Sequence, residues 1–101
     1  MTQYNKLVRD NIPEILTQKG VPHTFRIANE KEYWRKLKEK LREEVDEFIK
    51  AETIDEIADI LEVLGAIYDH QHLSVEEITR VKNDKHQKRG GFTKRIILEQ
   101  S

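Results

Sequence analysis

The sequence contains no cysteine in its 101 residues, which excludes a disulfide framework, a zinc site with cysteine ligands and a catalytic thiol. It also lacks any run of about 18 apolar residues, which a membrane-spanning helix would need. Its 18 Lys and Arg nearly balance 19 Asp and Glu, for a formal net charge of -1. A chain without excess positive charge lacks the usual electrostatics of a nucleic-acid binder. We therefore expect a soluble cytoplasmic protein that binds neither a membrane nor a nucleic-acid polymer.

Apolar residues are also few, at 37% of the chain against about 45–50% in a typical globular domain. A chain of this length supports one domain, expected over residues 1–101, with a core so small that oligomerisation would help to complete it. Charged residues make up another 37%. Acids concentrate in residues 39–62 and bases in residues 80–95, so the near-neutral total conceals a separation of charge along the chain.

Start and stop signals predict four helices. Pro13 and Gly20 bracket a short one. Three longer ones each begin with a capping-box pattern, in which Asn, Thr or Ser stands three residues before Glu. The patterns are Asn29/Glu32, Thr53/Glu56 and Ser74/Glu77. The expected helices run over about 12–19, 30–50, 54–70 and 75–88. Short loops between the three long helices favour antiparallel packing in a bundle.

The C-terminal segment 92–98 is rich in β-branched residues, and segment 23–28 alternates apolar and polar side chains. Both patterns are compatible with short extended segments that pair with each other. The expected fold class is therefore all-α, a helical bundle completed by oligomerisation, to which a short β-hairpin-like pairing of these segments could be added.

Four carboxylates project from helix faces that the apolar pattern would bury. At about 100° per residue, Glu44 falls within about 60° of the centre of the apolar stripe in 30–50, and Glu47 lies at its edge. Ten of the fifteen residues 54–68 are apolar, which implies that this helix is buried on two sides. Packing on both sides would place Glu56 and Asp59 next to a partner helix. Each pair is spaced i, i+3 and shares one helix face. Burying an unpaired carboxylate costs several kcal/mol, and a hard divalent cation removes that cost.

This pattern predicts an acidic pocket that holds Mg²⁺ and leaves positions open for substrate phosphates. The alternative is that the acids belong to solvated helix faces with Lys partners, as Glu43 and Asp46 do. A zinc site is disfavoured because, of the four histidines, only His70 and His72 lie close together in sequence. No Gly-rich phosphate loop precedes a helix.

Two acidic motifs stand close together, Glu43-Glu44-Val-Asp-Glu47 and, after eight residues, Glu56-Ile-Ala-Asp59. Together they resemble the E-E-x-x-E … E-x-x-D pattern of the all-α nucleoside triphosphate pyrophosphohydrolases, the MazG-like superfamily. Segments 6–15 and 85–92 resemble its short, single-domain house-cleaning branch. The likeness therefore extends over nearly the whole chain, and phosphoribosyl-ATP pyrophosphohydrolase is among the relatives of this family.

The resemblance implies hydrolysis of a nucleoside triphosphate, noncanonical ones included, to the monophosphate and pyrophosphate. It implies Mg²⁺ or Mn²⁺ as the cation, and a homo-oligomer that is a dimer or a dimer of dimers. By the same resemblance the metal ligands are Glu44, Glu47, Glu56 and Asp59. Two alternatives stay open: phosphoribosyl-ATP as the substrate, and a non-catalytic helical module that binds a nucleotide or another protein.

The proposed chemistry also needs cations for the phosphates and an acceptor for the proton of the attacking water. Lys85 and Arg89, spaced i, i+4 at the end of the last helix, are candidate phosphate ligands; alternatively they only complement a helix C-terminus. Lys6 and Arg9 form a second basic pair. Glu47, at the edge of the apolar stripe, is the predicted proton acceptor.

Overall fold

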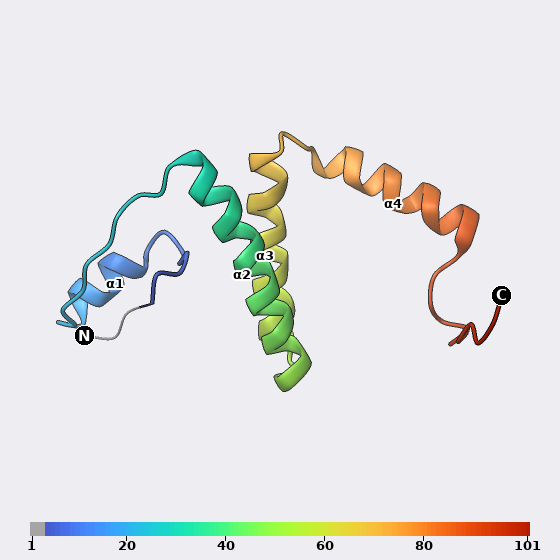
Figure 1. Cartoon of the computed structure of the whole chain (residues 1–101), viewed down its shortest axis with the longest axis horizontal. Coiled ribbons are helices and arrows are strands. Elements are labelled where there is room, and N and C mark those ends of the chain that lie inside the picture. Colours follow the sequence, from blue (N-terminus) through green and yellow to red (C-terminus); the bar gives the residue numbers. More distant parts are fainter. Residues whose placement is uncertain (1–3) are drawn as a thin grey trace.

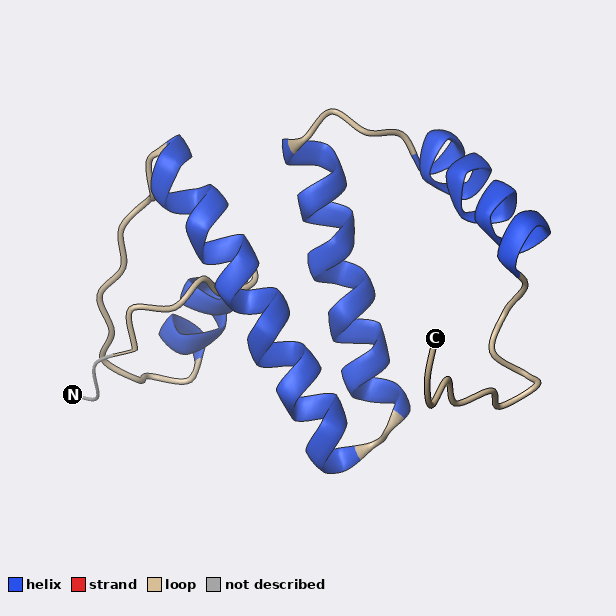
Figure 2. Cartoon of the chain, turned by 45° about the vertical axis from the view of Figure 1, so that its right-hand side comes forward, coloured by secondary structure: helices blue, strands red, loops and turns tan. Residues whose placement is uncertain are grey.

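A helical hairpin forms the centre of the computed structural model, which describes residues 4–101. Helices α2 (Glu30–Ala51) and α3 (Ile54–His70) run antiparallel and make the one extensive helix–helix contact in this described part of the chain (Figures 1 and 2). The chain reverses between them within two residues. Glu52 adopts the left-handed conformation there, with φ of 55°, which ends α2 and turns the backbone toward α3.

Two further helices flank the hairpin on opposite sides. The short α1 (Ile12–Gln18) and the segments around it lie on one side, where Lys36 Nζ donates a hydrogen bond of 2.7 Å to the Asn5 carbonyl (Figure 1). On the other side α4 (Val75–Arg89) departs from the end of α3 and extends away from it. The hairpin is thus joined to its N-terminal segment by side-chain contacts, whereas α4 projects from it.

The helix ends agree with the predicted ones, and side-chain caps fix the starts of α2 and α4. Ser74 and Glu77 form a reciprocal capping box: the Glu77 N–H donates to Ser74 Oγ at 3.1 Å and the Ser74 N–H to the Glu77 carboxylate at 3.4 Å. Asn29 accepts from the Glu32 N–H at 2.9 Å. The Glu32 carboxylate accepts hydrogen bonds from Arg26 and not from the Asn29 N–H, so the capping box is only half formed. The hydrogen bonds from Arg26 lower the pKa of Glu32 below its usual value.

The all-α prediction is confirmed, since no strand occurs in residues 4–101. Segments 23–28 and 92–98 are both irregular and lie on opposite sides of the hairpin, so the β-hairpin-like pairing is not formed within one chain (Figure 1). Within the same residues, no helix combines the length and the apolar character that crossing a bilayer requires.

The expected packing of a third long helix on the hairpin is corrected by the structure, because α4 makes no extensive contact with another described helix. Its sequence explains why. The apolar residues of α4 are Val75, Ile78 and Val81, all in its first half, and the second half is polar throughout. A helix with so short an apolar stripe gains little from packing against its own hairpin.

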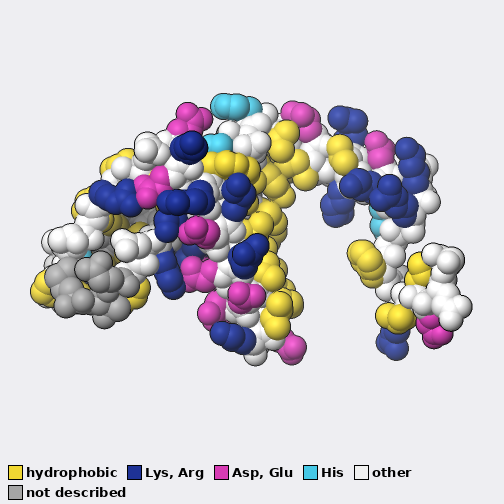
Figure 3. All heavy atoms as spheres, viewed as in Figure 1, with side chains coloured by type: hydrophobic (Ala, Val, Ile, Leu, Met, Phe, Trp, Pro, Cys, Tyr) yellow, Lys and Arg dark blue, Asp and Glu magenta, His cyan; other side chains and the backbone are white. Residues whose placement is uncertain are grey.

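The single chain is more open than a globular protein of its mass. Its accessible surface is 9467 Å² and its radius of gyration 17.9 Å, where a compact chain of this size would show about 6,000 Å² and about 13 Å. Leu37, Val63 and Glu44 are the buried residues of the described part. Figure 3 shows hydrophobic side chains exposed along the edge of the hairpin that faces α4.

Leu37 should contribute most to the stability of the hairpin, because only 2% of its surface is exposed. Leu37→Ala is expected to lower the free energy of unfolding by about 3 kcal/mol, measured by urea denaturation. Leu73→Ala is the matched control, since Leu73 is 43% exposed, and should cost about 1 kcal/mol or less. Equal losses in the two variants would contradict a core centred on the α2–α3 contact.

Candidate functional site

The interface between α2 and α3 changes from apolar to acidic along its length. On α2, the buried residues Leu37 and Glu44 lie seven positions apart, which places them on one face with about 10 Å between them along the axis. On α3, the buried Val63 follows the half-buried Glu56 by the same seven positions. Each helix therefore directs an apolar residue toward its partner near the open end and a carboxylate nearer the connecting loop.

The other two predicted ligands lie close to the same level of the hairpin. Asp59 is half-buried, whereas Glu47 is exposed. Because the chain reverses at residues 52–53, Glu47 on α2 lies roughly opposite Asp59 on α3, and the four acids occupy about 8 Å along the hairpin axis. The burial of Glu44, with only 9% exposed, agrees with its predicted place on the apolar stripe. Glu47 is exposed, and Glu43, expected on the solvent side, is half-buried. Residues 4–101 contain no group of three or more Asp, Glu or His side chains arranged to hold a metal ion.

Lys40 supplies the positive charge next to the buried carboxylate. Its Nζ lies 3.2 Å from Glu44 Oε1 and 3.7 Å from Glu43 Oε2. A buried carboxylate without a partner would cost several kcal/mol, so this contact is what allows Glu44 to face the interface. Lys40 was not among the predicted site residues, although its i, i+4 spacing to Glu44 could have identified it.

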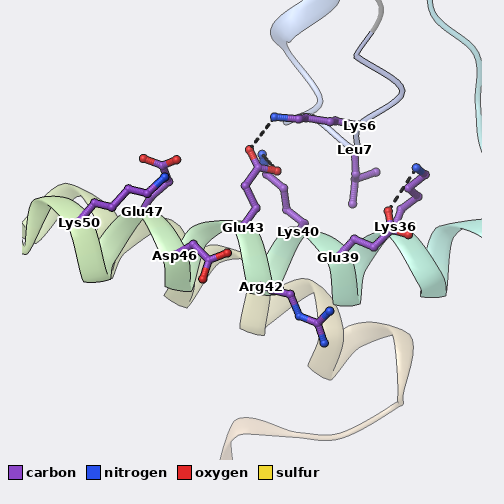
Figure 4. A pocket seen from close by; sticks show the side chains of 10 residues that line it. All are labelled: Lys6, Leu7, Lys36, Glu39, Lys40, Arg42, Glu43, Asp46, Glu47 and Lys50. Carbon is purple, nitrogen blue, oxygen red and sulfur yellow. Dashed lines mark hydrogen bonds and ion pairs between the residues drawn. The ribbon is translucent and has the colours of Figure 1, made fainter.

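The N-terminal segment brings both of its predicted cations to the acids of the hairpin. Arg9 Nη2 donates to Asp59 Oδ1 at 2.8 Å, and Arg9 Nη1 lies 3.8 Å from Glu62 Oε1. Lys6 Nζ donates to Glu43 Oε1 at 3.2 Å, as Figure 4 shows. These partners are 50 and 37 positions apart in sequence. The basic pair and the acids thus form one charged cluster.

A groove of about 380 Å³ runs between this N-terminal segment and α2 (Figure 4). Its volume is within the range of about 300–1,000 Å³ found for ligand pockets. Glu43 and Glu47 point to the side of α2 that faces Lys6, whereas Asp46 points away from it. The basic residues that line the groove are Lys6, Lys36, Lys40, Arg42 and Lys50. Four acids line it as well: Glu39, Glu43, Asp46 and Glu47. The predicted proton acceptor Glu47 therefore shares with Lys6 an open groove in which both charges are nearly balanced.

Glu56 is held by the residue that begins its helix. Thr53 stands at the N-cap of α3, but its hydroxyl donates to the Glu56 carboxylate and caps no backbone N–H. Glu56 also stands in the first turn of α3, where the helix dipole favours a negative charge. The residues that predicted the helix start therefore also orient one of the four candidate ligands.

Lys85 and Arg89 are not brought to these acids. Both are exposed in the second half of α4, which ends far from the loop end of the hairpin (Figures 1 and 3). No ion pair within residues 4–101 involves either of them. Two basic pairs were predicted to bind phosphate. Within the single chain only Lys6 and Arg9 contact acids of the hairpin, Glu43 and Asp59.

An aromatic cluster closes the opposite, open end of the hairpin. The rings of Trp34 and His70 stack in parallel with centroids 4.7 Å apart, and Tyr33 meets His70 edge-on at 5.8 Å. His70 Nε2 is buried and has no hydrogen-bond partner in the described part of the chain. Trp34 thus packs between the two helices as expected of a core residue, and we assign the cluster a packing role.

Comparisons with known proteins add one relative. An uncharacterized protein of Mycolicibacterium smegmatis is 44% identical over 50 residues, and the match covers 50% of this chain and 51% of that protein. The match therefore spans about half the length of each of the two proteins. No family model and no solved structure matches the chain.

Arg9 should hold the N-terminal segment on the hairpin through Asp59. Arg9→Gln is expected to raise amide hydrogen exchange in residues 4–10 while exchange in α2 and α3 stays unchanged, because exposed ion pairs contribute only about 1 kcal/mol or less to global stability. Arg26→Gln is the matched control, since it removes an ion pair outside the cluster. Equal exchange of residues 4–10 in the two variants would contradict this anchoring role.

Proposed function

We propose that the protein is a Mg²⁺-dependent pyrophosphohydrolase that converts a nucleoside triphosphate, surplus or noncanonical, to the monophosphate and pyrophosphate. The observation that carries the proposal is the burial of Glu44 in the α2–α3 interface. A buried ion pair is often no more stabilising than apolar residues of similar volume, so an acid at this position is poorly explained by stability. A binding role for the carboxylate, together with the resemblance of the two acidic motifs to the MazG-like superfamily, explains it better.

The donor set fits the proposed cation. Carboxylate oxygens are the ligands that Mg²⁺ prefers, and Mn²⁺ accepts them as well. The residues that would hold the ion are Glu44, Glu47, Glu56 and Asp59. When bound, the cation would supply positive charge to the triphosphate and lower the pKa of a coordinated water.

The remaining tasks fall to side chains of the groove and of the N-terminal segment. In the proposed reaction a water oxygen bonds to the α-phosphorus, the bond from that phosphorus to the bridging oxygen breaks, and pyrophosphate leaves. Glu47 accepts the proton of the water, a role that its exposed position in the groove permits. Lys6 and Arg9 stabilise the negative charge of the phosphates.

The cations next to the acids also explain how the acids can lie close together before a metal ion or substrate binds. Lys40 neutralises Glu44, and Arg9 neutralises Asp59. The Arg9 side chain is largely exposed, so turning it from Asp59 toward a phosphate costs little. Arg9 could thus exchange its carboxylate partner for the substrate as the site fills.

The activity test is pyrophosphate release in the presence of Mg²⁺ from a panel of canonical and modified nucleotides that includes phosphoribosyl-ATP. Glu44→Gln and Asp59→Asn should each lower the rate by about 100-fold or more. Asp69→Asn is the matched control, because Asp69 is exposed, lies at the opposite end of α3 from the candidate ligands and does not line the groove, and it should retain the activity.

Undiminished metal-dependent release in both site variants would refute the proposed activity. A wild type that releases pyrophosphate from none of the nucleotides would refute it as well. Calorimetry then examines the second candidate function suggested by the sequence. A protein that binds a nucleotide tightly without consuming it would be a non-catalytic nucleotide-binding module.

We also propose that the active form is a homo-oligomer, a dimer or a dimer of dimers. The support is the accessible surface of 9467 Å², which exceeds that of a compact chain by about 3,500 Å². Light scattering should give twice or four times the 12.0 kDa of the chain. A stable monomer at micromolar concentration would contradict the proposal.

A further inference from the structure

A row of alternating charges leads from the N-terminal segment to the interface between α2 and α3. Lys6 Nζ lies 3.2 Å from Glu43 Oε1, and Glu43 Oε2 lies 3.7 Å from Lys40 Nζ (Figure 4). Lys40 Nζ in turn lies 3.2 Å from Glu44 Oε1. Side-chain exposure falls along the row from 52% at Lys6 to 11% at Glu44. The row therefore begins in solvent and ends at the most buried of the four candidate metal ligands.

Lys40 is the cation that the fold assigns to Glu44. It stands one helical turn before Glu44 on the same face of α2. Of the ion pairs in residues 4–101, only the one with Lys40 includes Glu44. Lys36, a further turn away, contacts Glu39 and the Asn5 carbonyl. The charge of the buried carboxylate is thus balanced by one lysine.

Three of the four candidate ligands face partners of their own chain. Glu44 faces Lys40, Asp59 faces Arg9, and Glu56 accepts a hydrogen bond from the hydroxyl at the start of its helix. These separate contacts account for the lack, within residues 4–101, of three acids that converge on one point. Arg9 is largely exposed and the hydroxyl is uncharged, whereas Lys40 is a cation with only 22% of its side chain exposed. A metal ion at these acids would therefore compete most directly with Lys40.

An ammonium group and a divalent cation cannot both bind the same carboxylate strongly. Like charges about 4 Å apart repel each other, and a partly buried position screens that repulsion less than open solvent does. Binding of the cation at Glu44 therefore requires Lys40 to withdraw. The flexible four-carbon stem of a lysine permits such a movement. Glu43, whose Oε2 already lies 3.7 Å from Lys40 Nζ, is the acid that can receive it.

We propose that Lys40 is a built-in counter-ion of the metal site: it neutralises Glu44 before metal binds, withdraws toward Glu43 when the divalent cation arrives, and thereby sets the affinity for metal. This role rests on the proposed function, which assigns the cation to Glu44. Lys40 is a positioning residue, since it acts through Glu44 and not on the substrate. The exchange keeps the buried carboxylate paired with and without metal, so the hairpin is stable in both cases, and it weakens metal binding by the competition.

Titration with Mn²⁺ measures the competition without reference to activity. Electron paramagnetic resonance counts the free Mn²⁺ in solutions of the wild type and of each variant. Lys40→Met removes the competing charge and should raise the affinity for Mn²⁺ about 10-fold or more. Lys40→Arg keeps the charge and should bind Mn²⁺ about as the wild type does. Lys38→Met is the matched control, because Lys38 lies on the same helix but over the Trp34 ring, and it should change the affinity by about 2-fold or less.

Thermal unfolding with and without Mn²⁺ separates a counter-ion from a lysine that is only structural. In EDTA, Lys40→Met leaves Glu44 without a partner and should lower the Tm by about 5 °C. Saturating Mn²⁺ supplies a new partner, so the difference from the wild type should vanish. If Lys40→Met is unfolded in EDTA, Mn²⁺ should restore its helical circular dichroism. Adding Glu44→Gln to Lys40→Met removes the unpaired charge, which should recover the Tm in EDTA and abolish the gain in affinity.

The outcomes distinguish failure of the counter-ion from failure of the proposed activity. Equal Mn²⁺ affinity in the wild type and Lys40→Met, or an equal loss of Tm with and without Mn²⁺, would overturn the counter-ion role while the activity stands. Tighter Mn²⁺ binding by Lys40→Met, in a protein that releases pyrophosphate from no nucleotide, would refute the activity and support the counter-ion role. Absence of Mn²⁺ binding from both the wild type and Lys40→Met would overturn both.

Discussion

The structure depends on the contact between α2 and α3, because no other pair of described helices packs extensively. This contact is held together at its open end by Leu37, Val63 and the stack of Trp34 on His70. Toward the two-residue loop the same helix faces present Glu44 and Glu56. The apolar end supplies the rigidity, through burial and close packing, that lets the loop end carry acids whose own contribution to stability is small or unfavourable.

Charge compensation follows from that constraint. Because Glu44 faces the interface, it requires a cation, and Lys40 provides one from the preceding turn of the same helix. Asp59 on the facing helix receives Arg9 from the N-terminal segment. Two of the four candidate ligands, Glu44 and Asp59, are therefore paired with cations in the single chain. Arg9 is exposed enough to turn from its carboxylate toward a phosphate.

Incomplete burial links the fold to the proposed assembly. A hairpin with few buried residues cannot cover the apolar outer face of α3, and α4 carries too short an apolar stripe to do so within the chain. The apolar residues of the segment beyond α4 are likewise uncovered. Assembly of copies of the chain, as proposed, would cover these apolar surfaces.

The sequence by itself determined the four helices and their ends, because capping residues such as Ser74 and helix stops act over a few neighbouring positions. It also determined that Glu44 faces inward, since helical periodicity alone relates it to Leu37. Only the tertiary structure decided that Arg9 reaches Asp59, 50 positions later, and that α4 leaves the hairpin. Such outcomes depend on the path of the loops and on how much surface distant segments bury against each other. Local spacing and helix propensity contain no information about either.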